Sequence, residues 1–147
     1  MDQAAFSDMF GTIIDNTPYM KAIGAVYDGR SDDGLTMRLP WREDLVGDPE
    51  TRVIASGVVT ALLDNGSGMA VWDRLNEFKP IATLDLRIDY MRAAEPDRDL
   101  LVTAKCYKLT RSIGFVRAFA YEDTPDDPVA AAQAAFIIAS PSLTPKG

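Results

Sequence analysis

A single carboxylate stands out in the apolar segment at residues 52–72, RVIASGVVTALLDNGSGMAVW. This residue, Asp64, lies in a stretch whose apolar residues have helical spacing. Removing a carboxylate from water is costly, which favours a functional acid over a buried structural acid satisfied by Asn65 or Thr60. A carboxylate in such surroundings is a candidate for catalysis. Asp64 is therefore the leading candidate for chemistry.

The residue types that are missing narrow this chemistry. The chain has no histidine, which excludes Ser-His-Asp and Cys-His catalysis and removes the commonest zinc ligand. Its one cysteine, Cys106, has no partner for an internal disulfide and lies in a strand-like run. We expect a buried structural thiol there, because no histidine is present to activate it.

Composition and charge place the chain among globular proteins. The 147 residues are 47% hydrophobic and 25% charged, which is typical of one domain, assigned to residues 1–147. The net charge of −7 gives no general attraction to nucleic acids or anionic membrane surfaces, so we expect neither partner. The N-terminal residues do not resemble a secretory signal, and no apolar run is long enough to cross a bilayer. We therefore expect a cytoplasmic protein.

The elements that must position Asp64 follow from hydrophobic periodicity and turn residues. Helical spacing predicts a helix over residues 3–14, and Pro18 begins a second short helical turn. The long helix is predicted to have Ser56 as its N-cap and to run to about Arg74. Strands are predicted on both sides of the turn at residues 29–34, and then at residues 79–94, 99–110, 112–123 and 128–140.

In the run at residues 79–94, strict alternation puts Thr83 and Asp85 on one face and Leu84, Leu86 and Tyr90 on the other. The run at residues 128–140 is rich in alanine, which favours a helix, but its length and position favour a strand ending in AFIIAS. Short turns between consecutive strands indicate an antiparallel sheet. The prediction is an α+β domain with this sheet curled around the long helix.

The central pattern resembles a known family. Residues 55–57, Ala-Ser-Gly, open the long helix, Asp64 follows, and Thr83 and Asp85 lie on the next strand. This is similar to the hotdog-fold acyl-CoA thioesterases of the phenylacetate-degradation type, in which a His-Gly-Gly turn opens the central helix. In that family an acid follows nine residues after the histidine. The resemblance extends from about Pro18 to Ser140 and implies a hotdog fold, an antiparallel sheet wrapped around one long central helix.

The resemblance also implies a thioester hydrolase whose site is divided between two chains. The backbone N–H of Ser56, with Gly57 beside it, would bind the oxyanion that develops on the thioester carbonyl. Asp64 would act as general base or nucleophile, and Thr83 would hold the water or the carboxylate. Asp64 lies about 12 Å along the helix from its start. The acid of one subunit would therefore meet the helix start of another, in a homodimer or homotetramer with the site at the interface.

Substrate contacts are implied in the same way. Coenzyme A is part of the acyl-CoA substrate, and no metal or other cofactor is needed. Ala55 and Asn65 are expected to contact the substrate. Arg92 and Arg111 are expected to meet the coenzyme A phosphates, because arginine binds phosphate in a bidentate manner.

Two departures from the family leave alternatives open. Ala55 stands where the family has its histidine, and Asp48 corresponds to an upstream asparagine that often assists the oxyanion. The alternative function is therefore a hotdog protein that binds acyl-CoA or another acyl ligand without turnover. A third is a structural or regulatory dimer. Trp41 and Trp72 either line an acyl pocket or pack in the core or at an interface.

Overall fold

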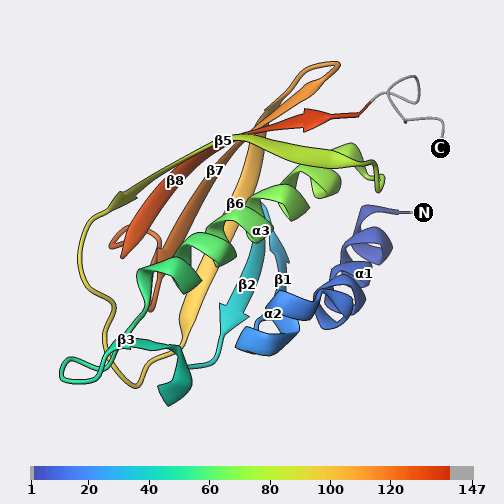
Figure 1. Cartoon of the computed structure of the whole chain (residues 1–147). Helices are drawn as coiled ribbons and strands as arrows, with labels where there is room; N and C mark the ends of the chain where they lie inside the picture. Colours follow the sequence, from blue (N-terminus) through green and yellow to red (C-terminus); the bar gives the residue numbers. More distant parts are fainter. Residues whose placement is uncertain (1, 140–147) are drawn as a thin grey trace, which may run out of the picture.

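The protein is built on one antiparallel sheet, seen in a computed structural model that describes residues 2–139 (Figure 1). Six strands form the sheet in the order β1-β2-β6-β7-β8-β5, and neighbouring strands are antiparallel. They are β1 (Val26–Ser31), β2 (Gly34–Leu39), β5 (Ile81–Tyr90), β6 (Leu100–Leu109), β7 (Ile113–Tyr121) and β8 (Ala130–Ile138). A small second sheet pairs β3 (Val46–Asp48) with β4 (Val53–Ile54).

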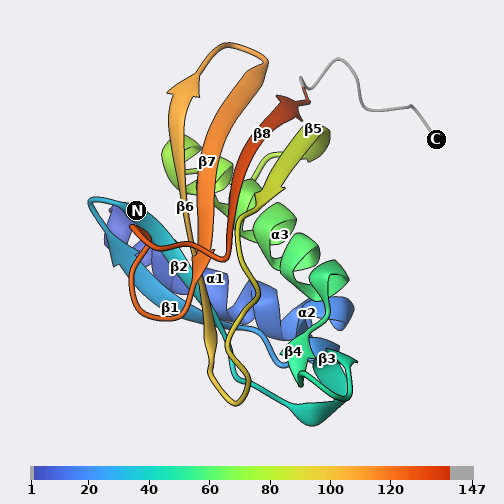
Figure 2. The ribbon, with the colours of Figure 1, turned by 90° about the vertical axis from the view of Figure 1, so that its left-hand side faces the viewer.

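The α-helices of the described range lie on the same side of this sheet (Figures 1 and 2). They are α1 (Gln3–Asn16), α2 (Pro18–Ile23) and α3 (Ser56–Leu75), and a short 3-10 helix, η1 (Glu43–Leu45), precedes β3. The predicted positions of all three α-helices are confirmed. So is the predicted α+β class, with an antiparallel sheet packed against one long helix.

The core lies between α3 and the sheet. The fully buried side chains include Leu62, Leu63 and Val71 of α3 and Val102 and Val116 of the sheet. Two glycines of α3 let it approach the sheet closely. A Cβ on Gly66 would lie 3.3 Å from Val102, and one on Gly68 would lie 3.4 Å from Phe136. A larger residue at either position would push α3 away from the sheet, and so away from the strands that contact its polar side chains.

A bulge in β5 overturns the predicted faces of this strand. Thr83 lies opposite Phe136 of β8, and Asp85 lies opposite the next residue, Ala135, so Leu84 is an extra residue. The extra residue reverses the alternation that the sequence predicts. The side chains on the α3 side are Ile81, Thr83, Leu86, Ile88 and Tyr90. Thr83 and Tyr90 therefore share a face, and Asp85 does not share the face of Thr83.

The alanine-rich final run forms a strand, as predicted. Ala130–Ile138 pairs with both β5 and β7, and its alternate residues Ala132, Ala134 and Phe136 are buried. Ser140, at the end of the predicted strand, lies outside the described residues. Across residues 2–139, no helix has the length and apolar character needed to span a membrane.

Candidate active site

The start of α3 carries exposed backbone donors. Ser56 is the first helical residue, and Ala55 is the N-cap, so the prediction of Ser56 as N-cap is wrong by one position. The N–H groups of Val58 and Val59 both donate to the Ala55 carbonyl, at 3.0 and 3.4 Å. The N–H groups of Ser56 and Gly57 have no acceptor within residues 2–139, and both residues are exposed. Free donors at the positive end of a helix form a natural site for an oxyanion.

Two hydroxyls meet the carbonyl oxygen of Ser56. Tyr90 Oη lies 2.9 Å from it and Thr60 Oγ1 lies 3.0 Å from it, and the two hydroxyls also contact each other. Tyr90 reaches this position because the bulge puts its side chain on the α3 face of β5. The sequence does not indicate Tyr90 as a site residue, since strict alternation puts it on the opposite face from Thr83. One signal in the sequence could have indicated Tyr90: it is a tyrosine at the end of the strand that carries the candidate site residue Thr83.

Asp64 and Thr83 meet as the resemblance implies. The Thr83 hydroxyl donates to Asp64 Oδ1 at 2.8 Å. Asp64 is partly exposed, because residues 60, 61, 64 and 65 of α3 lie outside the buried core-facing stripe of the helix, beside the edge strand β5. The carboxylate is therefore oriented by one hydrogen bond while it stays open to water. Its role in catalysis remains a prediction.

A cavity of about 220 Å³ opens beside this pair. Asp64, Asn65 and Thr83 give it a polar side. Its other walls are largely apolar and come from α1, α3 and the sheet: Ile13, Thr17, Gly68, Met69, Trp72, Ile81 and Phe136. An apolar cavity with a few convergent polar groups is typical of a small-molecule site. Trp72 thus lines a pocket, whereas Trp41 lies elsewhere, with the guanidinium of Arg52 4.7 Å from its ring centre.

The two halves of the candidate site are separate within one chain. Asp64 lies eight residues beyond Ser56 in the same helix, or about 12 Å along its axis. Ala55 packs against Gly47 beside the helix start. Asn65 lies at the cavity with Asp64. One chain therefore holds a donor half at Ser56–Gly57 and an acid half at Asp64.

Asp48 offers no donor to the helix start. Its carboxylate accepts hydrogen bonds from the Glu50 N–H at 3.0 Å and the Thr51 hydroxyl at 3.1 Å. An ionised carboxylate is an acceptor only, so it cannot replace the donor group of the family's asparagine. Its hydrogen bonds stabilise the turn between β3 and β4.

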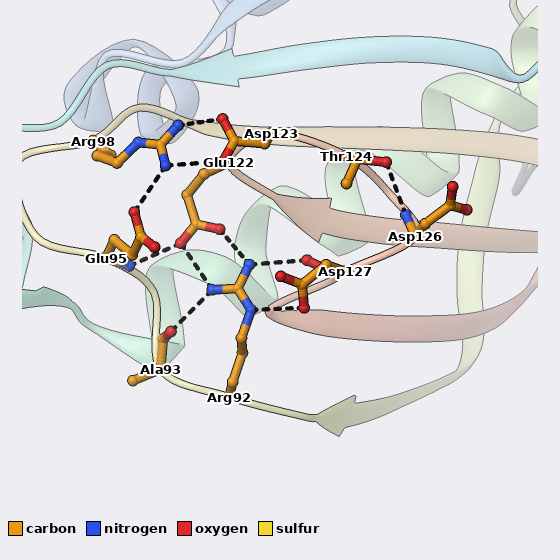
Figure 3. A network of polar contacts seen from close by, with 9 residues as sticks. All are labelled: Arg92, Ala93, Glu95, Arg98, Glu122, Asp123, Thr124, Asp126 and Asp127. Carbon is orange, nitrogen blue, oxygen red and sulfur yellow. Dashed lines mark hydrogen bonds and ion pairs between the residues drawn. The ribbon is translucent and has the colours of Figure 1, made fainter.

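Arg92 is held by a polar network between two loops (Figure 3). Its guanidinium pairs with both oxygens of Glu122, at 2.6 and 3.1 Å. The remaining N–H groups donate to Asp127 and to the carbonyl of Ala93, so all five donors are engaged. This occupancy argues against the expectation that Arg92 binds a phosphate. Figure 3 also shows Arg98 pairing with Glu95 and Asp123 beside this network.

Arg111 and Cys106 complete the predicted residues. Arg111 lies in the turn between β6 and β7, is exposed, and forms no ion pair with the described residues. Cys106 is buried, and burial raises the pKa of its thiol above the ordinary value, as suits an unreactive packing residue. Within residues 2–139, no three His, Cys, Asp or Glu side chains are grouped in a way that would hold a metal ion.

Comparison with known proteins places this geometry in a family. The model of the Thioesterase superfamily matches residues 53–129. A Pseudomonas aeruginosa protein of known crystal structure is 34% identical, with 92% of this chain and 98% of that chain covered and a TM-score of 0.80. A Halobacterium salinarum protein with the provisional name of an esterase is 27% identical over 106 residues, 69% of this chain and 68% of its own.

A more distant structure shows the same fold. A Haemophilus influenzae thioesterase has a TM-score of 0.80 at 16% identity, with 95% of this chain and 94% of that chain covered. The residues matched by the family model include the start of α3, Asp64 and Thr83, and they make up more than half of the sequence. The chain therefore has the hotdog fold and belongs to the Thioesterase superfamily.

Proposed function

We propose that this protein hydrolyses acyl-CoA thioesters to a free acid and coenzyme A, as thioesterases of the phenylacetate-degradation type do. Membership of the Thioesterase superfamily supports a hydrolase that acts on thioesters. The acyl-CoA substrate is the finer part of the proposal. The observation that carries it is the 2.8 Å hydrogen bond from Thr83 to Asp64 at the edge of an apolar cavity. A carboxylate oriented beside a cavity of this kind suits an acyl substrate.

The reaction follows from the groups present. Asp64 removes a proton from water, and the hydroxide attacks the carbonyl carbon of the thioester. In a second route, the carboxylate attacks this carbon itself and forms an anhydride that water then cleaves. In either route the carbonyl oxygen becomes an oxyanion, which the N–H groups of Ser56 and Gly57 bind. The C–S bond then breaks, and the thiolate of coenzyme A leaves with its electron pair and takes up a proton.

The site needs two copies of the chain, because its halves are about 12 Å apart in one helix. The strand β5 supports a pairing of copies, since it is an edge strand of ten residues. Leu84 and Met91 at this edge are 54% and 57% exposed. A long edge strand with exposed apolar residues pairs readily with another strand. Antiparallel pairing of two β5 strands would bring the Thr83–Asp64 end of one copy to the Tyr90–Ser56 end of the other.

The cavity also bears on the substrate. The aromatic side chains of Trp72 and Phe136 in its wall suit an acyl group that carries an aromatic ring. Arg111 is the better candidate for coenzyme A phosphates, because its guanidinium forms no ion pair or hydrogen bond with residues 2–139. The turn that carries Arg111 lies at the same end of the sheet as the cavity. The Ile138 N–H donates to the carbonyl of Ser112, next to Arg111, and Ile138 pairs with Ile81, which lines the cavity.

The decisive experiment is a panel of acyl-CoA substrates with release of free thiol as the readout. We expect turnover by the wild type and a loss of at least about 100-fold in kcat for Asp64→Asn, because the general base is removed. The matched control is Asp85→Asn, which changes an exposed acid on the other face of β5. Thermal unfolding should show that both variants fold.

Each other outcome has a meaning. Wild-type activity in Asp64→Asn would overturn the assignment of Asp64. Binding of acyl-CoA in calorimetry without turnover of any substrate would favour the non-catalytic alternative, which the alanine at position 55 motivates. A protein that is a monomer in solution would contradict the two-chain site.

A further inference from the structure

The carbonyl oxygen of Ser56 has an unusual environment for the first turn of a helix. Tyr90 Oη and Thr60 Oγ1 lie 2.9 and 3.0 Å from it, and the two hydroxyls are in hydrogen-bond contact with each other. Each hydroxyl has one hydrogen. One hydroxyl therefore donates to the Ser56 carbonyl, and the other donates either to the same oxygen or to the first hydroxyl. In every arrangement the carbonyl receives at least one hydroxyl hydrogen bond.

This carbonyl belongs to the same peptide unit as the N–H of Gly57. Hydrogen bonds to one end of a peptide group polarise the unit and strengthen the donor at its other end. They also fix the plane of the peptide, and so the direction in which the N–H points. The Gly57 N–H has no acceptor within residues 2–139, and it lies beside the free N–H of Ser56.

We propose that Tyr90 and Thr60 are positioning residues that orient and polarise the Gly57 N–H as the second donor to the oxyanion. The inference rests on the proposed thioester hydrolysis. It assigns two residues to the support of an oxyanion donor, a role for which the site otherwise has no side chain. Ala55 has no polar side chain, and the Asp48 carboxylate is an acceptor engaged in its own turn. The hydroxyls of Tyr90 in β5 and Thr60 in α3 thus support the Gly57 donor, which neither Ala55 nor Asp48 can do.

A purely structural role for the pair makes different predictions. If the hydroxyls only fastened β5 to α3, their removal would lower stability and leave the chemistry per folded molecule unchanged. If they act through Gly57, their removal lowers kcat with little change in KM, because an oxyanion forms only in the reaction.

The kinetic test uses Tyr90→Phe, Thr60→Val and the double variant, with acyl-CoA hydrolysis as the assay. Either hydroxyl alone can still reach the carbonyl, so we expect each single variant to lose about 3-fold in kcat and the double variant more than the product, about 10- to 30-fold. Thr60→Ser keeps the hydroxyl, so its kcat should equal that of the wild type. The matched controls are Tyr19→Phe and Thr12→Val, which remove exposed hydroxyls that form no hydrogen bond within the described chain.

A second readout does not depend on turnover. The amide proton of Gly57, observed by NMR in the folded wild type, should move upfield in the double variant, because a less polarised N–H is less deshielded. The amide of Gly11 in α1 serves as an internal reference. An unchanged Gly57 shift would overturn the inference. So would a double variant with wild-type kcat when Asp64→Asn is inactive.

The two proposals fail in different ways. A wild type that cleaves no thioester would refute the proposed function, and the Gly57 shift would still decide whether the hydroxyl pair acts on this peptide. Active wild type with an unaffected double variant would refute only the role of Tyr90 and Thr60.

Discussion

The hydrogen bond from Thr83 to Asp64 joins the first half of β5 to the middle of α3. It engages Oδ1 of the carboxylate, and Oδ2 forms no hydrogen bond within the described part of the chain. A carboxylate anchored through one oxygen keeps the other free for a water molecule or for attack on carbon. The residue pair thus combines orientation with access, the two properties that a base or nucleophile needs.

This arrangement makes a specific prediction for Thr83. Thr83→Val keeps the shape of the side chain but removes the donor, and we expect kcat to fall about 10-fold, the loss of one charge-assisted hydrogen bond that orients the acid. Thr83→Ser retains a hydroxyl and should stay close to the wild type. Steady-state kinetics on the same substrate would test both. Equal activities of the Val and Ser variants would show that the hydrogen bond has no role in turnover.

Single residues were predictable to different degrees. The sequence indicates Asp64 because a lone carboxylate in an apolar helix is conspicuous, and Thr83 because of its place in a family pattern. The structure brings the two side chains together, and their catalytic roles stay predictions. Arg92 was expected to bind phosphate, since nothing in its local sequence indicates that Glu122, 30 residues later, is its partner. Side chains that are paired across long sequence separations cannot be recognised from composition or periodicity.

At the scale of elements, the bulge in β5 decides which residues share a face. Without it, Thr83 and Tyr90 would point to opposite sides of the sheet, because they are an odd number of positions apart, seven, and side chains alternate. With it, both point towards α3, one near Asp64 and the other near Ser56. Periodicity predicted the strand correctly but not its faces, because a bulge depends on the pairing with β8.

The loops that follow β5 and β7 are joined by a nearly buried ion pair. The Glu122 side chain is only 2% exposed and that of Arg92 is 30% exposed. Burial by itself raises the pKa of Glu122, but hydrogen bonds from Arg92 and from the Glu95 N–H, with the charge of Arg92, outweigh it and hold the pKa below the ordinary value. Because Arg92 comes two residues after Tyr90, this pair also fixes the end of the strand that reaches the helix start.

The pKa of Glu122 gives a prediction for stability against pH. A group whose pKa is lowered by folding stabilises the fold above its ordinary pKa, here 4.5, and this contribution is lost as the pH falls from there through the folded-state pKa. Glu122→Gln should therefore cost about 2 kcal/mol in the free energy of unfolding at pH 7 and progressively less below pH 4.5. Urea unfolding of wild type and variant at several pH values would measure the difference.

The control for this prediction is Asp126→Asn in the same loop. The carboxylate of Asp126 is exposed and forms no hydrogen bond or ion pair with the described residues. We expect its variant to follow the wild type at each pH. A constant difference between wild type and Glu122→Gln from pH 7 to pH 3 would show that Glu122 does not carry the charge effect.

For the whole molecule, the sequence was sufficient to predict the layers. Short turns between alternating runs required an antiparallel sheet, and a long apolar helix required a cover on most of its sides. The matched family and the related structures confirm this arrangement. Assembly was not predictable in the same way, since an edge strand such as β5 indicates pairing but does not specify how many copies join.

The division of the site between two chains can be tested by mixing two inactive variants. Ser56→Pro removes one oxyanion donor but suits the first helical position, where proline is favoured, and Ala55 before it already has an extended ψ of 134°. We expect this variant to fold and to lose about 100-fold in kcat, the typical effect of one lost oxyanion donor. The second variant, Asp64→Asn, keeps the helix start intact but removes the acid, which is the other half of the site.

In a heterodimer of these two variants, one site combines both defects and the other combines the intact acid with the intact helix start. Half of the dimers formed by random refolding of an equal mixture are heterodimers, so about a quarter of the wild-type activity should return. A site built within one chain would regain nothing, because each chain carries one defect. Thiol release by the refolded mixture, with each variant refolded alone as control, therefore separates the two architectures.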